Sequence, residues 1–195
     1  MKIIALIIAL ISIVTTVKSQ DKKFLVDFKQ SEIIWVGKKL GGEHTGTLKV
    51  KSGSMTINNG LITQGEFVID MSSLTCSDLK DEGANATLVG HLKSPDFFDV
   101  EKYPEAKMEI TESTKADGEF YVAKGQLTIK GITNPYSFRF VYKMDEGLFI
   151  GMANMEVDRA KYNVQYGSES FFKNIGDKVI YDIFDLQVKL IGKPL

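Results

Sequence analysis

Cysteine is almost absent from this chain, since Cys76 is the single cysteine among 195 residues. One thiol cannot form an internal disulfide, and the paired cysteines of zinc ribbons and thioredoxin-like redox sites are excluded with it. Hydrophobic residues make up 44% of the sequence and charged residues 25%, which is ordinary for a folded globular domain. The stability of the fold must therefore come from a packed apolar core.

Arginine is also scarce, because Arg139 and Arg159 are the only two, and the lysines form no long basic run. The formal net charge is −1, and it becomes −3 if the first 19 residues, which carry two lysines and no acidic residue, are removed. A protein that binds the phosphate backbone of a nucleic acid needs a basic surface. Nucleic acid is therefore not expected as a partner.

Common catalytic motifs are missing as well. The sequence contains no GxSxG elbow, no HExxH, no Walker loop, no CxxC and no GxGxxG. Two isolated histidines, His44 and His91, are a weak signal for a metal site, and a hydrogen-bonded histidine in the core is the favoured interpretation of each. The sequence predicts no catalytic residue, no metal and no cofactor.

The N-terminus carries the pattern of a secretory signal peptide. Lys2 precedes the apolar run IIALIIALISIV, which is shorter than the 18 or so residues that a spanning helix needs. Val17 and Ser19 fit a small-residue cleavage site before Gln20, and an uncleaved anchor is the alternative. We expect residues 1–19 to be a signal peptide, residues 20–195 to form a single β-barrel domain, and the mature protein to be periplasmic or secreted.

Most of the mature chain alternates apolar and polar residues, which is typical of half-buried β-strands. Eight to ten strands are separated by turn signals such as Asn58-Asn59-Gly60, and no internal repeat or linker is visible. A sheet this long must close or split to hide its edges. The sequence predicts an all-β fold, an extended antiparallel eight-stranded barrel, with a β-sandwich as the alternative. The predicted strands include residues 32–39, 43–51, 54–57, 61–71, 106–111, 120–131, 136–144, 148–158 and 179–191.

One segment, residues 79–104, breaks the strand pattern. Ala84, Leu88 and Leu92 recur every fourth residue and predict one face of a helix, with His91 beside Leu88. Ser94-Pro95 then resembles the start of a second short helix, which would carry Phe97 and Phe98. This helical segment must cover apolar surface near one end of the barrel, either a filled core or the mouth of a cavity.

In the strand that starts at residue 43, His44 and Gly46 share the inward face with Leu48 and Val50. A glycine inside a strand marks a bulge, or the close approach of a ligand or another backbone. If the barrel is hollow, a large side chain at Gly46 should fill the cavity and leave the barrel folded. Asp182 also falls on an apolar face, so it lies at the barrel rim or pairs with an inward cation.

Several motifs in fixed order resemble the YceI-like family over roughly Phe24 to Ile191. The family is a group of lipocalin-like barrels that hold a long isoprenoid chain, so the resemblance implies an interior lipid site. The chain departs from the family pattern before His91, after Arg159 and in the long loop 166–178, where contacts to a polar head group would lie. The motifs are Trp35-x-Gly37, His44-Thr45-Gly46, Ser72-Ser73-Leu74, HLKSPDFFD from His91, Tyr103-Pro104 and GQLTIKGIT from Gly125.

The pattern and the resemblance together predict extracytoplasmic, non-catalytic binding or transport of an isoprenoid lipid of the quinone or prenyl-phosphate type. Two alternatives remain: an enzyme that uses His44 or His91 as a base with Arg159 at an anionic head group, or a filled barrel that serves as an interaction module. Expected partners are the lipid itself and, transiently, membranes or lipid-handling proteins, for a monomer or a homodimer. The candidate ligand contacts are Trp35, His44, Gly46, Phe67, Leu88, His91, Phe97, Phe98, Leu127, Ile129 and Arg159.

Overall fold

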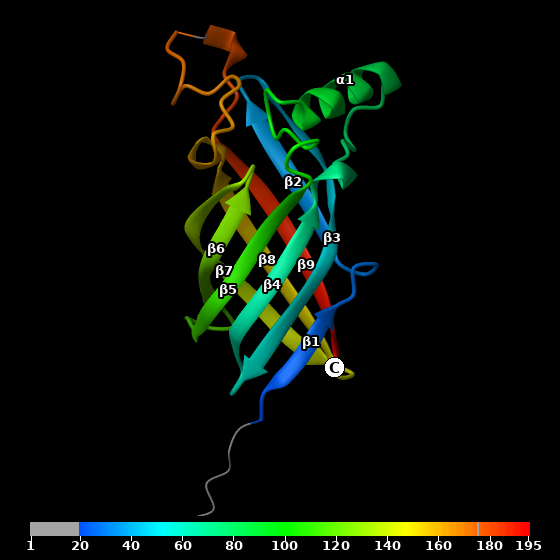
Figure 1. Cartoon of the computed structure of the whole chain (residues 1–195), viewed down its shortest axis with the longest axis vertical. Helices are drawn as coiled ribbons and strands as arrows, with labels where there is room; N and C mark the ends of the chain where they lie inside the picture. The colour runs from blue at the N-terminus through cyan, green and yellow to red at the C-terminus, as the bar shows by residue number, and fades with distance from the viewer. Residues whose placement is uncertain (1–19, 175) are drawn as a thin grey trace, which may run out of the picture.

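The computed structural model describes residues 20–174 and 176–195, so the predicted signal peptide lies outside the described residues. Nine strands, one α-helix and three short 3-10 helices follow one another along this part of the chain (Figure 1). No helix within it is long and apolar enough to span a membrane. The elements are β1 Lys22–Val26, β2 Glu32–Lys39, β3 Gly42–Asn58, β4 Leu61–Asp70, η1 Met71–Ser73, α1 Glu82–Lys93, β5 Glu105–Lys115, β6 Tyr121–Ile129, β7 Ile132–Asp145, β8 Leu148–Asp158, η2 Arg159–Tyr162, η3 Gly176–Lys178 and β9 Ile183–Pro194.

The strands close into a barrel in which every pairing is antiparallel. From β2 to β9 each strand pairs with the next one in the chain, and β9 pairs back with β2. β1 pairs with β3 and β9, the same two strands that flank β2, but nearer to their other ends. β1 and β2 therefore share one strand position, and the barrel has eight such positions. The predicted eight-stranded closed barrel is confirmed, and the sandwich alternative is wrong.

Tight hairpins explain why neighbouring strands pair in chain order. Asn59-Gly60, Lys130-Gly131 and Glu146-Gly147 are two-residue turns in which both residues have positive φ. Such turns match the right-handed twist of the strands they join, and their second position favours glycine because glycine has no Cβ to clash. Local sequence therefore favours these hairpins.

Several strand boundaries differ from those predicted: β5 extends to Lys115, β7 begins at Ile132, and β1 was not predicted. β3 is one strand of 17 residues, and the stretch after Val50 is its continuation and not a separate strand. The register shifts between Val50 and Ser52, where a bulge interrupts the alternation that the sequence reading relied on. The last strand begins at Ile183 and not at Val179, because residues 179–182 belong to the loop that follows η2.

The helical segment contains one helix, α1, and the predicted second helix is wrong. Asp81 caps the N-terminus of α1, since its side chain accepts a hydrogen bond from the amide of Ala84. Ser94 ends α1 by donating its amide and its hydroxyl to the carbonyl of His91. The chain then forms successive turns, with Asp99 in the left-handed region at φ 51°, which is incompatible with a continuing helix.

The two ends of the barrel differ. Figure 1 shows α1 and the loop after η2 at one end, and the β7–β8 hairpin and the C-terminus at the other. Aromatic rings close this second end: Tyr142 lies 5.1 Å from Phe149, and Phe149 lies 6.2 Å from Phe24, between ring centroids. The Tyr142 hydroxyl donates to the carbonyl of Gly60 at 2.7 Å, and so ties β7 to the β3–β4 turn. The barrel therefore has a sealed base and one end available for an opening.

Candidate ligand cavity

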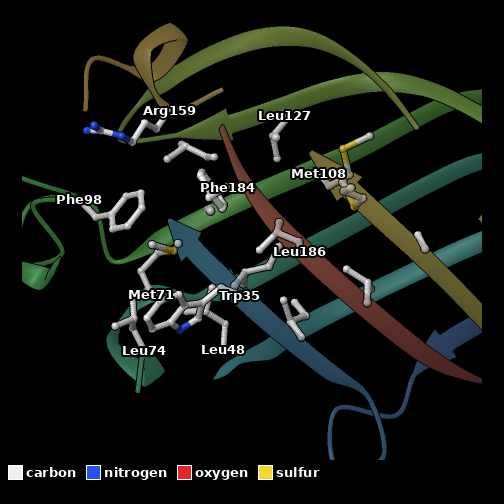
Figure 2. Close-up of a pocket in the computed structure, with 18 of the residues that line it drawn as sticks. Trp35, Leu48, Met71, Leu74, Phe98, Met108, Leu127, Arg159, Phe184 and Leu186 are labelled. Atoms are coloured by element: carbon white, nitrogen blue, oxygen red, sulfur yellow. The ribbon is translucent and has the colours of Figure 1, made fainter. Parts of the chain in front are cut away.

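A cavity of about 390 Å³ occupies the barrel between the aromatic base and α1. Its walls come from the inward faces of the strands, and Figure 2 shows side chains such as Leu48, Met108, Leu127 and Leu186 pointing into one space. The inward side chains of β9, which include Phe184, Leu186, Val188 and Leu190, are only half-buried although they lie inside the barrel. Water-accessible apolar walls inside a closed barrel show that the interior is hollow.

Ten of the eleven residues predicted from the sequence line this cavity. Leu88 and His91 reach it from α1, and Phe97 and Phe98 from the turns that follow. Gly46 is the exception. The ten are Trp35, His44, Phe67, Leu88, His91, Phe97, Phe98, Leu127, Ile129 and Arg159.

The prediction missed Met71 and Leu74, which lie on η1 and immediately after it and cover the cavity beside Trp35 (Figure 2). Both side chains are buried. Asp70 folds the chain here, since its carboxylate accepts from the amide and the hydroxyl of Ser72. The Asp-x-Ser pattern is a sequence signal for such a turn, but it does not show which side chains the turn directs into the barrel.

Gly46 faces inward, as its phase predicts, but the space in front of it is filled by protein. A Cβ atom built on Gly46 would lie 1.8 Å from the carbonyl oxygen of Thr75 and 2.7 Å from Nε1 of Trp35. The indole Nε1 donates a hydrogen bond to that same carbonyl at 2.9 Å. Of the three explanations for the glycine, close approach of another backbone is the one that the structure supports, and Gly46 does not line the cavity.

Gly46→Ala is therefore expected to destabilise the fold. The Thr75 backbone must move to admit the Cβ, and the Trp35 hydrogen bond is strained or lost with it. Overpacking of this kind lowers the free energy of unfolding by roughly 1 to 3 kcal/mol. Urea unfolding measures it, with Gly42→Ala as the control, since a Cβ on Gly42 of the same strand has no neighbour within 4 Å. Equal urea midpoints for the two variants would contradict the close approach.

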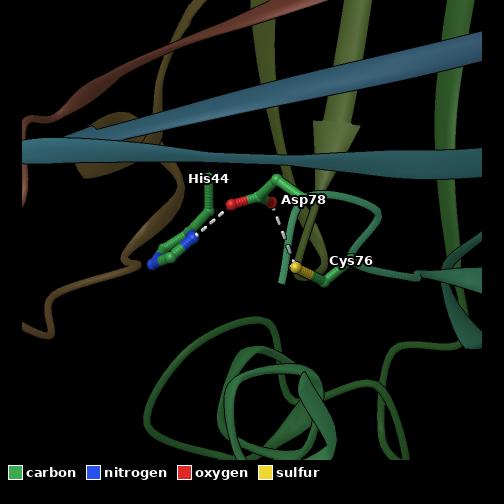
Figure 3. A group of neighbouring side chains, drawn as sticks. All are labelled: His44, Cys76 and Asp78. Atoms are coloured by element: carbon green, nitrogen blue, oxygen red, sulfur yellow. Dashed lines mark hydrogen bonds and ion pairs between the residues drawn. The ribbon is translucent and has the colours of Figure 1, made fainter. Parts of the chain in front are cut away.

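His44 meets two residues that lie more than 30 positions away in the sequence. Its Nδ1 lies 2.8 Å from Oδ2 of Asp78, and the thiol of Cys76 donates to Oδ1 of the same carboxylate at 3.2 Å (Figure 3). The amide of Thr45 also donates to that Oδ1 at 2.8 Å. Partial burial opposes ionisation, but the hydrogen bonds outweigh it and lower the pKa of Asp78 to about 2. Asp78 is thus a carboxylate at neutral pH, and His44 has the polar partners that a partly buried imidazole requires.

Arg159 is 2% exposed, and its guanidinium is directed at protein acceptors. Nε donates to the carbonyl of Tyr181, Nη1 to those of Val164 and Tyr166, and Nη2 to that of Ile180. Nη2 also lies 3.3 Å from Oδ1 of Asp182. Of the two predicted explanations for this aspartate, a place at the barrel rim or a pair with an inward cation, the ion pair with Arg159 is confirmed. Because these acceptors hold the guanidinium, Arg159 organises the loop over the mouth, and the predicted contact of its charge with a ligand head group is not supported.

Aromatic rings surround His91 at the mouth. Its ring lies 4.3 Å from that of Tyr166 and 5.8 Å from that of Phe97, in edge-to-face arrangements. Phe98 in turn meets Phe184 of β9 at 6.3 Å. These contacts link α1 and the turns after it to the loop that Arg159 holds and to the barrel wall.

The fold and the motifs match those of a known family. A family model described as the YceI-like domain matches residues 24–190. This chain belongs to the YceI-like family. The resemblance inferred from the sequence motifs is thereby confirmed over nearly the whole barrel.

Relatives of known sequence share a shorter segment with this YceI-like protein. UPF0312 protein plu2095 of Photorhabdus laumondii is 56% identical over 45 residues, and a UPF0312 protein of Serratia proteamaculans is 49% identical over 45 residues. Each alignment covers 23% of this chain and 23% of the relative. The matched segment thus spans about a quarter of the length of these curated relatives.

Solved structures share the fold at low sequence identity. BcnA of Burkholderia cenocepacia superposes with a TM-score of 0.66 at 20% identity, covering 85% of this chain and 98% of BcnA. A polyisoprenoid-binding domain from Saccharophagus degradans superposes with a TM-score of 0.63 at 15% identity, covering 88% and 98%. At such identity the likeness shows the fold alone.

In this member of the YceI-like family the polar lining residues gather at one end. Lys38 and Lys39 at the end of β2, His44 near the start of β3 and His91 on α1 lie at the mouth. Towards the base the walls are aliphatic and aromatic, as with Val50, Met108 and Phe149. The cavity is therefore amphipathic along its length, with a polar rim and an apolar interior.

Proposed function

We propose that this YceI-like protein binds an isoprenoid lipid, of the quinone or prenyl-phosphate type, inside the barrel, and carries it outside the cytoplasm without chemical conversion. The observation that carries the proposal is the hollow apolar interior, closed at its base by aromatic rings and open at a polar mouth. A chain-like apolar molecule with one polar end is complementary to such a space. The polyisoprenoid-binding domain of Saccharophagus degradans, which shares the fold, supports this ligand class.

The ligand enters tail first in this proposal. The apolar tail displaces water from the walls near Val50 and Phe149, and the head remains beside Lys39 and His44 at the mouth. Burying apolar surface contributes roughly 25 cal/mol per Å². Discrimination among head groups then rests on the mouth, and affinity rests on the tail.

Native mass spectrometry of the protein purified without detergent tests the function. A bound lipid that is recovered unchanged after incubation supports a carrier. The hydrogen bond from His44 to Asp78 is the arrangement of an oriented general base, so chemical change of that lipid would favour the enzyme alternative instead. If the protein contains no lipid and takes up none from added quinone, it is an interaction module and the proposal fails.

The depth of the cavity predicts how affinity depends on tail length. The lining residues of β9 run from Phe184 to Leu190, about 20 Å along the strand at 3.3 Å per residue. With a strand tilt of about 40° the depth along the barrel axis is about 15 Å. An extended isoprene unit, with four chain bonds of about 1.5 Å, measures at most about 5 Å. The cavity therefore accommodates about three extended units.

We expect each isoprene unit up to about the third to strengthen binding by about tenfold, since five carbons at about 0.3 kcal/mol each contribute about 1.5 kcal/mol. Further units should add little, because they extend past the mouth. Quenching of Trp35, the only tryptophan and a lining residue, by quinones of increasing tail length measures the affinities. Affinity that is independent of length from one unit onward would exclude the barrel interior as the tail site.

A further inference from the structure

His44, Cys76 and Asp78 bring three kinds of metal-ligating atom together beside the mouth of the cavity. One nitrogen, one sulfur and one carboxylate oxygen all lie within 4.8 Å of one another. Figure 3 shows the carboxylate of Asp78 between the imidazole and the thiol. Across residues 20–174 and 176–195 this is the single group of three or more histidine, cysteine, aspartate or glutamate side chains so arranged.

The segment that carries Cys76 and Asp78 is held against β3 by its backbone. The amide of Thr75 donates to the carbonyl of Thr47 at 3.1 Å, and the amide of Ser77 donates to that of Thr45 at 2.8 Å. Gly46, between these two partners, permits this approach because it has no side chain. The ligand atoms are thus positioned by main-chain contacts, as a site that binds an ion with defined geometry requires.

Two peptide groups of this segment are held from a second direction. The side-chain amide of Asn85 on α1 donates to the carbonyls of Cys76 and Leu79, at 2.9 and 3.0 Å. Cys76 itself is buried, but its sulfur is directed at the Asp78 carboxylate. The side chains of His44 and Asp78 are 25% and 31% exposed, so an ion from solvent reaches the group without unfolding of the segment.

We propose that His44, Cys76 and Asp78 bind a divalent transition-metal ion, with Zn²⁺ as the best match. Thiolate, imidazole and carboxylate are the ligands that zinc takes in proteins, and three protein ligands leave a fourth position open. Zn²⁺ replaces the proton of the Cys76 thiol, which is released to water, and binds the neutral imidazole through Nδ1, whose proton moves to Nε2 through solvent. The site lies at the rim of the apolar cavity, with which it shares His44, and metal binding there does not depend on lipid binding.

The geometry requires only a local contraction. Bonds of about 2.0 to 2.3 Å in a tetrahedral arrangement place ligand atoms about 3.5 Å apart. The present separations, none above 4.8 Å, must therefore shorten by at most about 1.3 Å, within reach of side-chain rotation. The hydrogen bonds to Asp78 from His44 and Cys76 are exchanged for bonds to the ion, whereas that from the Thr45 amide remains to orient the carboxylate.

Cobalt titration tests the site, using protein without a histidine tag and freed of metal by a chelator. We expect one equivalent of Co²⁺ to give visible bands and a near-ultraviolet thiolate-to-cobalt band, and Zn²⁺ to displace both. Cys76→Ser should lose the near-ultraviolet band. Both Cys76→Ser and His44→Ala should bind Co²⁺ more than about 100-fold more weakly than the wild type, because each removes a direct metal ligand. Removal of a residue that only hydrogen-bonds to a ligand already lowers metal affinity by about 10- to 100-fold. His91→Gln, at the same mouth but packed on Tyr166, should bind Co²⁺ as the wild type does.

A second measurement uses the unmodified chain, so it does not depend on the folding of any variant. Because Cys76 is the only cysteine, alkylation reports on this thiol alone. Zn²⁺ should slow the alkylation in proportion to the occupancy measured with cobalt, whereas Mg²⁺, which prefers oxygen ligands, should not. Absence of the near-ultraviolet band together with unchanged alkylation in Zn²⁺ would overturn the proposal and identify the three residues as a hydrogen-bonded network alone.

Discussion

Arg159→Met is expected to lower the free energy of unfolding by about 3 to 5 kcal/mol, because it removes one partner of a buried ion pair and leaves the other uncompensated. The guanidinium is 2% exposed and donates to four carbonyls, among them those of Val164 and Ile180, while it neutralises Asp182. Methionine fills much of the same volume but donates no hydrogen bond. The loop over the mouth should detach from η2 and β9.

Urea unfolding measures the loss, and two variants control for it. Arg139→Met removes the only other arginine, which is exposed and stacks over Phe120, so its free energy of unfolding should stay within about 0.5 kcal/mol of the wild-type value. Arg159→Lys keeps the charge but has three donors in place of five, so it should fall between the two methionine variants. Equal stability of Arg159→Met and Arg139→Met would show that the loop is held by other contacts.

The variants Phe97→Ala and Leu88→Ser are expected to differ in stability, because Phe97 is part of the core at the mouth and Leu88 only covers the cavity. Phe97 is buried, with its ring 5.3 Å from that of Phe98 and 5.3 Å from the Arg159 guanidinium carbon. Its loss should lower the free energy of unfolding by about 3 to 5 kcal/mol. Leu88 is half-buried on α1, a fully described helix with no buried residue, so Leu88→Ser should change stability little. Sequence reasoning grouped the two residues as one cover, and the structure divides them.

Leu88→Ser and Phe97→Ala are also expected to show whether α1 slows the release of a bound ligand. Leu88→Ser removes roughly 1 kcal/mol of apolar contact between α1 and a bound tail, so quinone should leave about fivefold faster. Loss of such a contact appears mainly in the dissociation rate. Stopped-flow recovery of Trp35 fluorescence measures it, beside the urea midpoints of both variants. If Leu88→Ser unfolds as readily as Phe97→Ala while release is unchanged, α1 is part of the core and does not cover the cavity.

Much of the barrel could be predicted because strand alternation is a local property. The period of two in β9 assigns Phe184, Leu186 and Val188 to one face, and any closed sheet must direct that face inward. The failures follow from the same reasoning. A bulge after Val50 breaks the period, so β3 was divided in two. Ser94-Pro95 carries a helix-start signal, but Ser94 instead caps the end of α1.

The candidate site was predicted only in part, because local patterns identify inward residues but not the residues that meet them. The motifs and the inward phase identified the cavity lining, including Trp35, Leu127 and Ile129, without any knowledge of contacts. They gave no sign that Cys76 and Asp78 would meet His44, since the segment between η1 and α1 has no periodicity that places it on β3. Nor did they show that the acceptors of Arg159 lie in the loop after η2.

The sequence by itself determined the antiparallel barrel, most of its inward faces, the position of the one helix and the family. Only the tertiary structure decided what stands in front of each inward residue. Gly46 meets the Thr75 carbonyl and not a ligand, and Arg159 meets backbone carbonyls and Asp182 and not a head group. Periodicity specifies the direction of a side chain, because it depends on backbone geometry within a few residues. The neighbour that a side chain meets depends on long-range chain packing, which no local pattern encodes.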